Sequence, residues 1–186
     1  MNKKSIAFSE AAGSVFIYCT AVFLHFVYPL SRGAALSIIF GAVNESVWEH
    51  SKIFSAAYIG WSLLQLCWLK VGFKRYVVAK CIGLYTLAGM VIGAYYLYTS
   101  FTGGNIIWAD ILLSLAAVVL TQALTYRLET EENRLPEYFA PALMLIMLYY
   151  LMFFSFTIFP PKIELFRDPV SGGYGLIQRI AEKEGR

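Results

Sequence analysis

Long apolar runs constrain this chain more than any other feature of its sequence. Five of them hold roughly 20 residues or more, enough for a helix rising about 1.5 Å per residue to cross a hydrocarbon core of about 30 Å. Only 15% of the residues are charged and the mean hydropathy is +0.61, whereas a soluble domain carries roughly 25% charged residues. We therefore predict an all-α, polytopic helical membrane bundle that forms a single integral membrane domain over residues 1–186. The expected spans are residues 10–30, 44–69, 76–101, 106–126 and 138–159.

The apolar segment 33–43 is too short for a full span and favours a re-entrant or interfacial helix. Turn-forming residues precede it, and Asn44 after it is a good N-cap for the second span. If this segment crossed the membrane instead, the orientation of everything after it would be inverted.

Lysine and arginine are placed asymmetrically between the expected loops. Lys3 and Lys4 precede the first span, and Lys70, Lys74, Arg75 and Lys80 surround the second loop. By the positive-inside rule, the N-terminus is expected in the cytoplasm. The basic residues of the C-terminal tail argue against this orientation, but the second loop carries more weight. The acidic segment 129–137 is interpreted as a solvated cytoplasmic connection.

The run Asn-Glu-Ser-Val-Trp-Glu-His-Ser-Lys at positions 44–52 places four ionisable groups at the boundary of the second span. Ionisable groups near lipid usually face a bundle interior or a water-filled cavity and mark function. On a helix, Glu45, Glu49 and Lys52 share one face, with His50 on the adjoining face. The candidate catalytic residues are Glu49 as a general base, His50, and Lys52 as an anion-pairing group.

The expected topology brings further polar residues to the same side of the membrane. His25 lies near the end of the first span, Asp110 near the start of the fourth, and Asp168 after the fifth. Imidazole and carboxylate groups are ligands of zinc, manganese and iron. The candidate metal ligands are His25, Glu45, Glu49, His50 and Asp110, with zinc or manganese as the possible cofactor. The alternative is a structural network in which these groups hold segment 33–43 in place.

The C-terminal segment 160–186 is expected to be an extramembrane tail. Pro160 and Pro161 end the last helix, and Asp168-Pro169 and Gly172-Gly173 predict tight turns. Its apolar residues suggest that the tail folds back as a lid over the outer face; the alternative is an amphipathic tail on the membrane surface. The candidate substrate-binding residues at this face are Asn44, Glu45, Trp48 and Asp168. Elsewhere, Gly89 and Gly93 form a GxxxG pattern that predicts close helix packing.

Three strings together resemble a family of small bacterial multi-pass membrane proteins. They are His-Phe-Val-Tyr at 25–28, Asn-Glu-Ser-Val-Trp-Glu-His with Lys52 at 44–52, and Asp-Pro-Val-Ser-Gly-Gly-Tyr-Gly at 168–175. The resemblance covers most of the chain. It implies a helical membrane fold and that these segments belong together. The expected location is the bacterial cytoplasmic membrane. It implies no activity and therefore no catalytic residue.

Two functions remain open from the sequence. The first is an integral membrane protein with a polar, metal-binding pocket at the extracytoplasmic face, which binds or hydrolyses a lipid headgroup or a small polar molecule. The second is a non-catalytic transporter subunit or an accessory membrane protein, with another membrane protein or a second copy of the chain as its partner. Whether the protein is an enzyme is left open, and the lipid bilayer is expected around it in both cases. The small net charge of +3 gives no indication of nucleic-acid binding.

Overall fold

The computed structural model describes residues 3–132 and 134–176, which form helices and connecting segments without a strand. The elements are α1 (Lys3–Leu30), α2 (Ala35–Phe40), α3 (Val47–Gln65), α4 (Phe73–Thr102), α5 (Ile107–Thr130), the 3-10 helix η1 (Leu135–Tyr138), α6 (Phe139–Ile158) and the 3-10 helix η2 (Glu164–Phe166).

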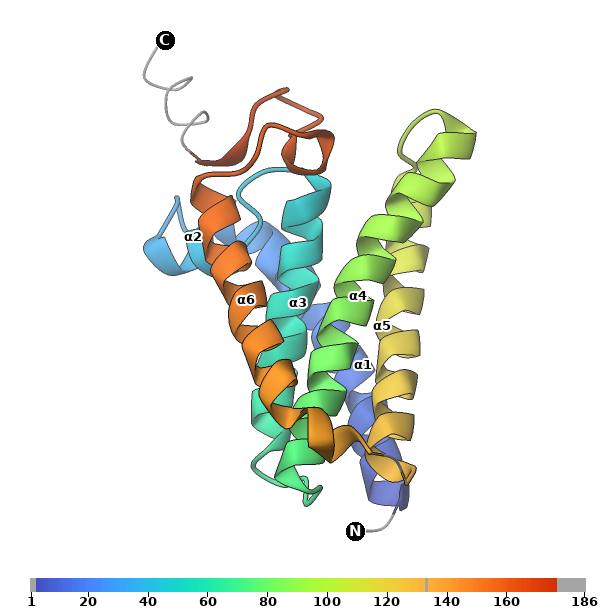
Figure 1. Ribbon diagram of the computed structural model, residues 1–186. Coiled ribbons are helices and arrows are strands. Elements are labelled where there is room, and N and C mark those ends of the chain that lie inside the picture. Colours follow the sequence, from blue (N-terminus) through green and yellow to red (C-terminus); the bar gives the residue numbers. More distant parts are fainter. Residues whose placement is uncertain (1–2, 133, 177–186) are drawn as a thin grey trace.

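Five long helices, α1, α3, α4, α5 and α6, run along one bundle axis (Figure 1). The start of α1, the α3–α4 loop and the α5–α6 connection lie at one end, which we call the amino end. The connection from α1 through α2 to α3, the α4–α5 loop and residues 160–176 lie at the opposite end, which we call the tail end. The segments that carry the predicted polar residues therefore lie at the same end of the bundle, as predicted.

Four of these helices are long and apolar enough to cross a membrane: α1, α4, α5, and α6 together with η1. Helix α3 does not reach that hydropathy, so the predicted count of about five spans is not confirmed. The physical reason is that α3 is covered by the other helices. Twelve of its nineteen residues are buried, among them Glu49, Lys52 and Gln65. A helix surrounded by protein can carry polar residues that a lipid-facing helix cannot.

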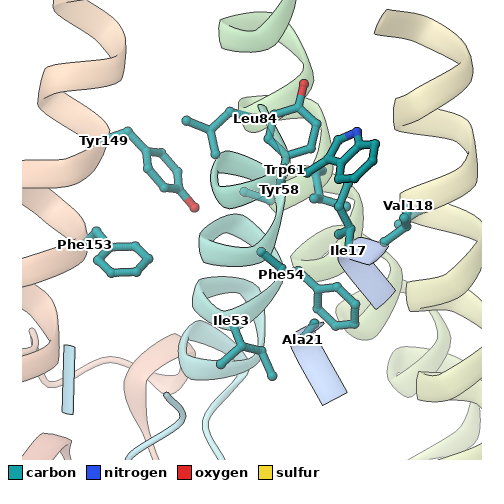
Figure 2. Close-up of a cluster of buried hydrophobic side chains, with 14 of the residues drawn as sticks. Ile17, Ala21, Ile53, Phe54, Tyr58, Trp61, Leu84, Val118, Tyr149 and Phe153 are labelled. Atoms are coloured by element: carbon teal, nitrogen blue, oxygen red, sulfur yellow. The ribbon is translucent and has the colours of Figure 1, made fainter. Parts of the chain in front are cut away.

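The apolar core lies between all five long helices (Figure 2). Ile53, Phe54, Tyr58 and Trp61 project from α3 into this core. They meet side chains from each of the other long helices: Ile17 and Ala21 of α1, Leu84 of α4, Val118 of α5, and Tyr149 and Phe153 of α6. With these side chains in the core, α3 is the most buried of the five long helices.

The outer faces of the bundle are apolar as well. Large hydrophobic side chains are exposed along α1, α5 and α6, for example Phe23, Leu112 and Met144, the last with 71% of its surface accessible. Exposed apolar surface of this extent on several adjacent helices is unfavourable in water and favourable in lipid. The exposed faces therefore agree with a membrane protein.

The segment 33–43 contains only the six-residue helix α2, about 9 Å long and too short to cross a bilayer. This agrees with a re-entrant or interfacial helix. The N-cap of α3 differs from the prediction: it is Ser46, whose hydroxyl accepts a hydrogen bond from the Glu49 amide at 3.3 Å. Asn44 instead accepts from the Ser46 amide at 2.9 Å and shapes the turn before the helix.

Residues 160–176 fold back onto the tail end of the bundle. Phe166 is buried, and its ring centroid lies 5.1 Å from Trp48 and 5.2 Å from Phe156. Arg167 and Tyr174 form an isolated antiparallel bridge that closes the turn between them. The tail is therefore packed against α3 and α6 as far as residue 176, and the rest of the expected tail lies outside the described residues.

Close helix packing occurs at different glycines from those of the GxxxG pattern. A Cβ added at Gly89 or Gly93 would meet nothing within 4 Å, so none of the described helices approaches closely there. A Cβ at Gly83 would overlap the Tyr58 hydroxyl and lie 2.6 Å from a methyl carbon of Thr125. The GxxxG prediction is therefore wrong within the described chain, and Gly83 provides the close contact of α4 with α3 and α5.

We expect Gly83→Ala to lower the stability of the folded protein by about 1–3 kcal/mol, because its methyl group overlaps a buried, rigid tyrosine. Gly89→Ala, on the same helix, is the matched control and should be neutral or stabilising by up to about 1 kcal/mol, since alanine favours a helix. Thermal unfolding in detergent, followed by circular dichroism, measures both. Equal unfolding midpoints for the two variants would contradict the packing described for Gly83.

Candidate functional site

Two histidines and a glutamate come together at the tail end of the bundle. His25 lies near the end of α1, Glu45 in the turn before α3, and His50 in the first turns of α3. The Glu45 Oε2 atom lies 3.6 Å from His50 Nε2 and 3.9 Å from His25 Nε2. One ligand atom from each residue falls within 4.8 Å of the other two. The three side chains are 26–43% exposed, so water and small solutes reach them.

The orientation of His50 follows from the start of α3. Its Nδ1 atom lies 2.9 Å from the Ser46 carbonyl oxygen. Because a carbonyl can only accept, Nδ1 carries the hydrogen, and in the neutral ring Nε2 keeps its lone pair. That lone pair faces the Glu45 carboxylate, which is also an acceptor. A proton or a cation between the two groups relieves this repulsion.

The geometry of the three residues fits a metal ion. Ligands bound tetrahedrally at about 2.1 Å lie roughly 3.4 Å apart, so the observed separations need only small side-chain rotations. A hydrogen bond from the other imidazole nitrogen to a backbone carbonyl, as His50 makes with Ser46, is the usual way to orient a histidine ligand. Two histidines and one carboxylate leave further coordination positions open. The arrangement can hold zinc, manganese or iron and present it to solvent.

The other two candidate ligands are elsewhere. The Glu49 carboxylate binds the Lys52 ammonium at 2.6 Å and accepts from the Val43 amide at 3.0 Å. Asp110 accepts hydrogen bonds from the Tyr98 hydroxyl and, at 3.3 Å, from the Asn105 side-chain amide, both within the α4–α5 hairpin. The structure therefore brings three of the five candidate ligands together, His25, Glu45 and His50, while Glu49 and Asp110 make other contacts. Glu49 and His50 separate because adjacent residues on a helix point about 100° apart.

The Glu49–Lys52 pair connects three parts of the chain. Both side chains are at most 2% exposed. The Lys52 ammonium also donates to the Ile38 carbonyl of α2 at 3.3 Å and to the Thr157 hydroxyl of α6 at 3.1 Å, so all three of its donors are used. With the Val43 bond of Glu49, these contacts fix segment 33–43 against α3 and α6. They match the structural alternative, in which the ionisable groups hold that segment in place.

The candidate substrate-binding residues other than Glu45 are engaged in internal contacts. Trp48 is buried against Phe156 and Phe166, and Asn44 shapes the turn before α3. Asp168 is buried, and its carboxylate accepts hydrogen bonds from the Val170 amide at 3.2 Å and the Ser171 hydroxyl at 2.5 Å.

A cavity of about 420 Å³ lies between α4, the start of α3 and the tail. It is lined by Val47, Tyr95, Tyr96, Thr99, Glu164, Arg167 and Pro169. Its lining residues Val47, Arg167 and Pro169 are next in sequence to the predicted residues Trp48 and Asp168, but none of the predicted site residues lines the cavity.

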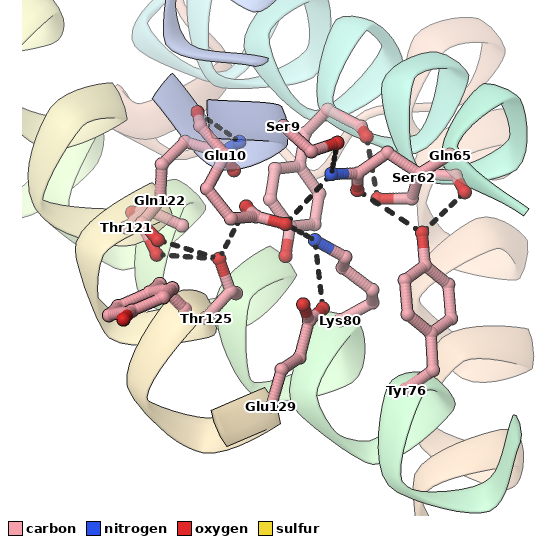
Figure 3. Close-up of polar contacts among 12 residues, drawn as sticks. Ser9, Glu10, Ser62, Gln65, Tyr76, Lys80, Thr121, Gln122, Thr125 and Glu129 are labelled. Atoms are coloured by element: carbon pink, nitrogen blue, oxygen red, sulfur yellow. Dashed lines mark hydrogen bonds and ion pairs between the residues drawn. The ribbon is translucent and has the colours of Figure 1, made fainter. Parts of the chain in front are cut away.

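A second buried polar cluster, at the amino end, was not indicated by the motif at 44–52 (Figure 3). The hydropathy and charge patterns place Glu10 at a span boundary, Lys80 beside a loop and Glu129 in a solvated segment. In the structure all three are buried, and Lys80 Nζ lies 2.8 Å from Glu10 and 3.2 Å from Glu129. A usable signal was present: Gln65, Lys80 and Gln122 lie inside or beside apolar runs, where polar side chains need partners.

The chain belongs to a family of unknown function, DUF6512, whose model matches residues 3–176. This agrees with the expected membership in an uncharacterised family, while the signature strings and the bacterial origin stay predictions. No curated protein and no solved structure matches the chain significantly.

We expect Lys52→Met to lower the unfolding free energy by about 3–5 kcal/mol, because it leaves the buried Glu49 carboxylate without its partner. The double variant Glu49→Gln/Lys52→Met should recover much of this loss, since neither remaining side chain is charged. Thermal unfolding in detergent measures both.

The matched control is Glu164→Gln, which breaks an ion pair of the same i,i+3 spacing on the surface. It should change the unfolding midpoint little, since exposed pairs contribute little. If Lys52→Met unfolds at the midpoint of the wild type, the Glu49–Lys52 pair does not hold segment 33–43.

Proposed function

We propose that this protein is an integral membrane protein that holds a divalent metal ion, zinc or manganese, on His25, Glu45 and His50, and binds or hydrolyses a lipid headgroup or small polar molecule there. The observation that carries the proposal is the convergence of three ligand atoms within 4.8 Å, one of them on a histidine already oriented by a backbone carbonyl. Without a proton or a cation, the Nε2 lone pair of His50 faces the Glu45 carboxylate, which is an unfavourable contact between two acceptors.

The residues around the cluster support a rigid site. The Ser46 carbonyl sets the ring of His50, and the Glu49–Lys52 pair holds the connection that carries Glu45. A metal ion in such a site supplies Lewis acidity and lowers the pKa of a bound water. Glu45 would serve either as a ligand or as the acceptor of a proton from that water, since its side chain is the most exposed of the three at 43%.

The ligand class follows from the nearby cavity. Small-molecule sites commonly measure about 300–1,000 Å³ and combine apolar walls with a few polar groups. This cavity has tyrosine and proline walls, the Thr99 hydroxyl, and the Arg167 guanidinium, one nitrogen of which pairs with Glu164 at 3.2 Å. A guanidinium binds phosphate and carboxylate groups well. A lipid headgroup or a small anionic molecule therefore suits it, and the packed tail that forms one wall acts as the lid.

The proposed orientation places the amino end in the cytoplasm and the tail end outside a bacterial cytoplasmic membrane. Support comes from the basic residues at the amino end: Lys3 and Lys4 at the start of α1, and Lys70, Lys74 and Arg75 around the α3–α4 loop. In this orientation the metal cluster and the cavity face the extracytoplasmic side.

A non-catalytic role as a transporter subunit or accessory protein is the second candidate. One observation favours it: the buried cluster around Glu10, Lys80 and Glu129 lies inside the bundle at the end opposite to the histidines. Ionisable groups buried between membrane helices commonly belong to ion or proton pathways.

The test of the metal site is the metal content of the protein purified in detergent without chelator, measured by elemental analysis. We expect close to one zinc or manganese ion per chain in the wild type, and its loss in His25→Ala/His50→Ala. Both histidines are partly exposed, so the double variant should keep the unfolding midpoint of the metal-free wild type.

Asp110→Asn is the control. The sequence pattern predicts Asp110 as a metal ligand, but in the structure its carboxylate accepts hydrogen bonds within the α4–α5 hairpin. It should retain the metal. A folded wild type that contains no metal and takes up neither zinc nor manganese in equilibrium dialysis would contradict the proposal, as would metal retained by the double histidine variant.

A further inference from the structure

Three helices place ionisable side chains in one enclosed cluster at the amino end (Figure 3). Glu10 comes from α1, Lys80 from α4 and Glu129 from α5. None of the three is more than 5% exposed. The Lys80 ammonium lies between the carboxylates, 2.8 Å from Glu10 Oε1 and 3.2 Å from Glu129 Oε1.

The charges in this cluster do not balance. Two carboxylates and one ammonium leave one negative charge. Among the described residues, Lys80 is the basic residue that forms an ion pair with each of the two carboxylates. The other titratable groups near the cluster are Tyr58 of α3 and Tyr76 and Cys81 of α4, which are neutral in their ordinary state at neutral pH. An uncompensated charge in such a site is strongly unfavourable, so the group takes up a proton instead.

The two carboxylates have different surroundings. Glu10 accepts hydrogen bonds from the Gln65 side-chain amide and the Lys80 ammonium, both at 2.8 Å, and from the Thr125 hydroxyl at 2.9 Å. These donors stabilise its ionised form. Neither oxygen of Glu129 makes a hydrogen bond with a described residue; its polar contact is the 3.2 Å approach to Lys80. Glu129 is therefore the carboxyl group that carries the proton.

We propose that Glu129 is a proton-binding site inside the membrane bundle, protonated at neutral pH, and that gain and loss of this proton are coupled to the packing of α1, α4 and α5. Loss of the proton creates a second buried negative charge beside Lys80. The Lys80 ammonium is then attracted more strongly to Glu129, and its ion pair with Glu10 is weakened. The two carboxylates belong to different helices, so proton occupancy favours one arrangement of these helices over another.

A proton would reach Glu129 from the amino end. Glu129 lies in the last turn of α5, which ends at Thr130. Glu131, which follows Thr130, is exposed, and its backbone carbonyl accepts a hydrogen bond from Arg75 at 2.7 Å. Water at the end of the helix is thus within one turn of the carboxyl group. A metal cation is a poorer occupant, because the Lys80 ammonium already stands between the two carboxylates.

The experiment is infrared spectroscopy of the purified protein in detergent as the pH is raised. A protonated carboxyl group gives a C=O stretch that shifts in deuterium oxide and disappears on ionisation. We expect this band in the wild type at neutral pH, its loss in Glu129→Gln, and its retention in Asp110→Asn. A wild type without the band, or a band that persists in Glu129→Gln, overturns the proposal.

Thermal unfolding distinguishes the two carboxylates independently. Glu129→Gln replaces a neutral acid with a neutral amide and should shift the midpoint by only a few degrees at neutral pH. Glu10→Gln removes the ionised partner of Lys80 and should lower the midpoint by about 10 °C. Equal losses in the two variants overturn the assignment of the proton to Glu129. Sodium titration at constant ionic strength tests for a metal cation. If sodium raises the unfolding midpoint of the wild type but not that of Glu129→Gln, the site binds a metal cation, and the proposal is overturned.

Discussion

Helix α3 carries polar and charged side chains through the middle of a bundle whose outer surface is apolar, and the rest of the structure depends on satisfying them. Lipid offers no hydrogen-bond partners, so the partners come from the surrounding helices. Lys52 binds α2 and α6 near one end of α3, and Gln65 binds Ser9 and Glu10 of α1 at the other. Between them, the Ser55 hydroxyl lies 2.6 Å from the Tyr149 hydroxyl of α6. These bonds and the apolar core together determine which helices surround α3.

The polar groups are divided into two clusters with different access to water. The histidine cluster at the tail end is partly exposed, and its groups are acceptors that a metal ion or a proton can join. The cluster around Glu10 at the amino end is enclosed, and its lysine is already shared between two carboxylates. The apolar core in Figure 2 lies between α3 and the other long helices and includes Ile53, Tyr58 and Leu84. The same bundle therefore has a partly exposed cluster at its tail end and an enclosed cluster at its amino end.

The candidate site was predictable in part. The polar run at 44–52 and its position next to a helix start are sequence features, and they identify Glu45 and His50 correctly as neighbours of His25. The same run does not say that Glu49 turns inward to Lys52, because that choice depends on Val43, Ile38 and Thr157 being present around it. Lys80 shows the limit of charge-based topology. A lysine near a loop in the sequence can still lie inside the bundle when a carboxylate of another helix faces it.

By itself the sequence determined the all-helical class, the presence of helices apolar enough to cross a membrane, the approximate helix positions and the short helix before α3, because hydropathy and residue spacing are properties of neighbouring residues. Only the tertiary structure decided which helix is central and which ionisable groups meet. Glu10 and Lys80 are 70 residues apart in the chain, and Lys52 and Thr157 are 105 apart. Such contacts are set by how whole helices pack, since each helix must bury its polar groups against partners that local patterns do not identify.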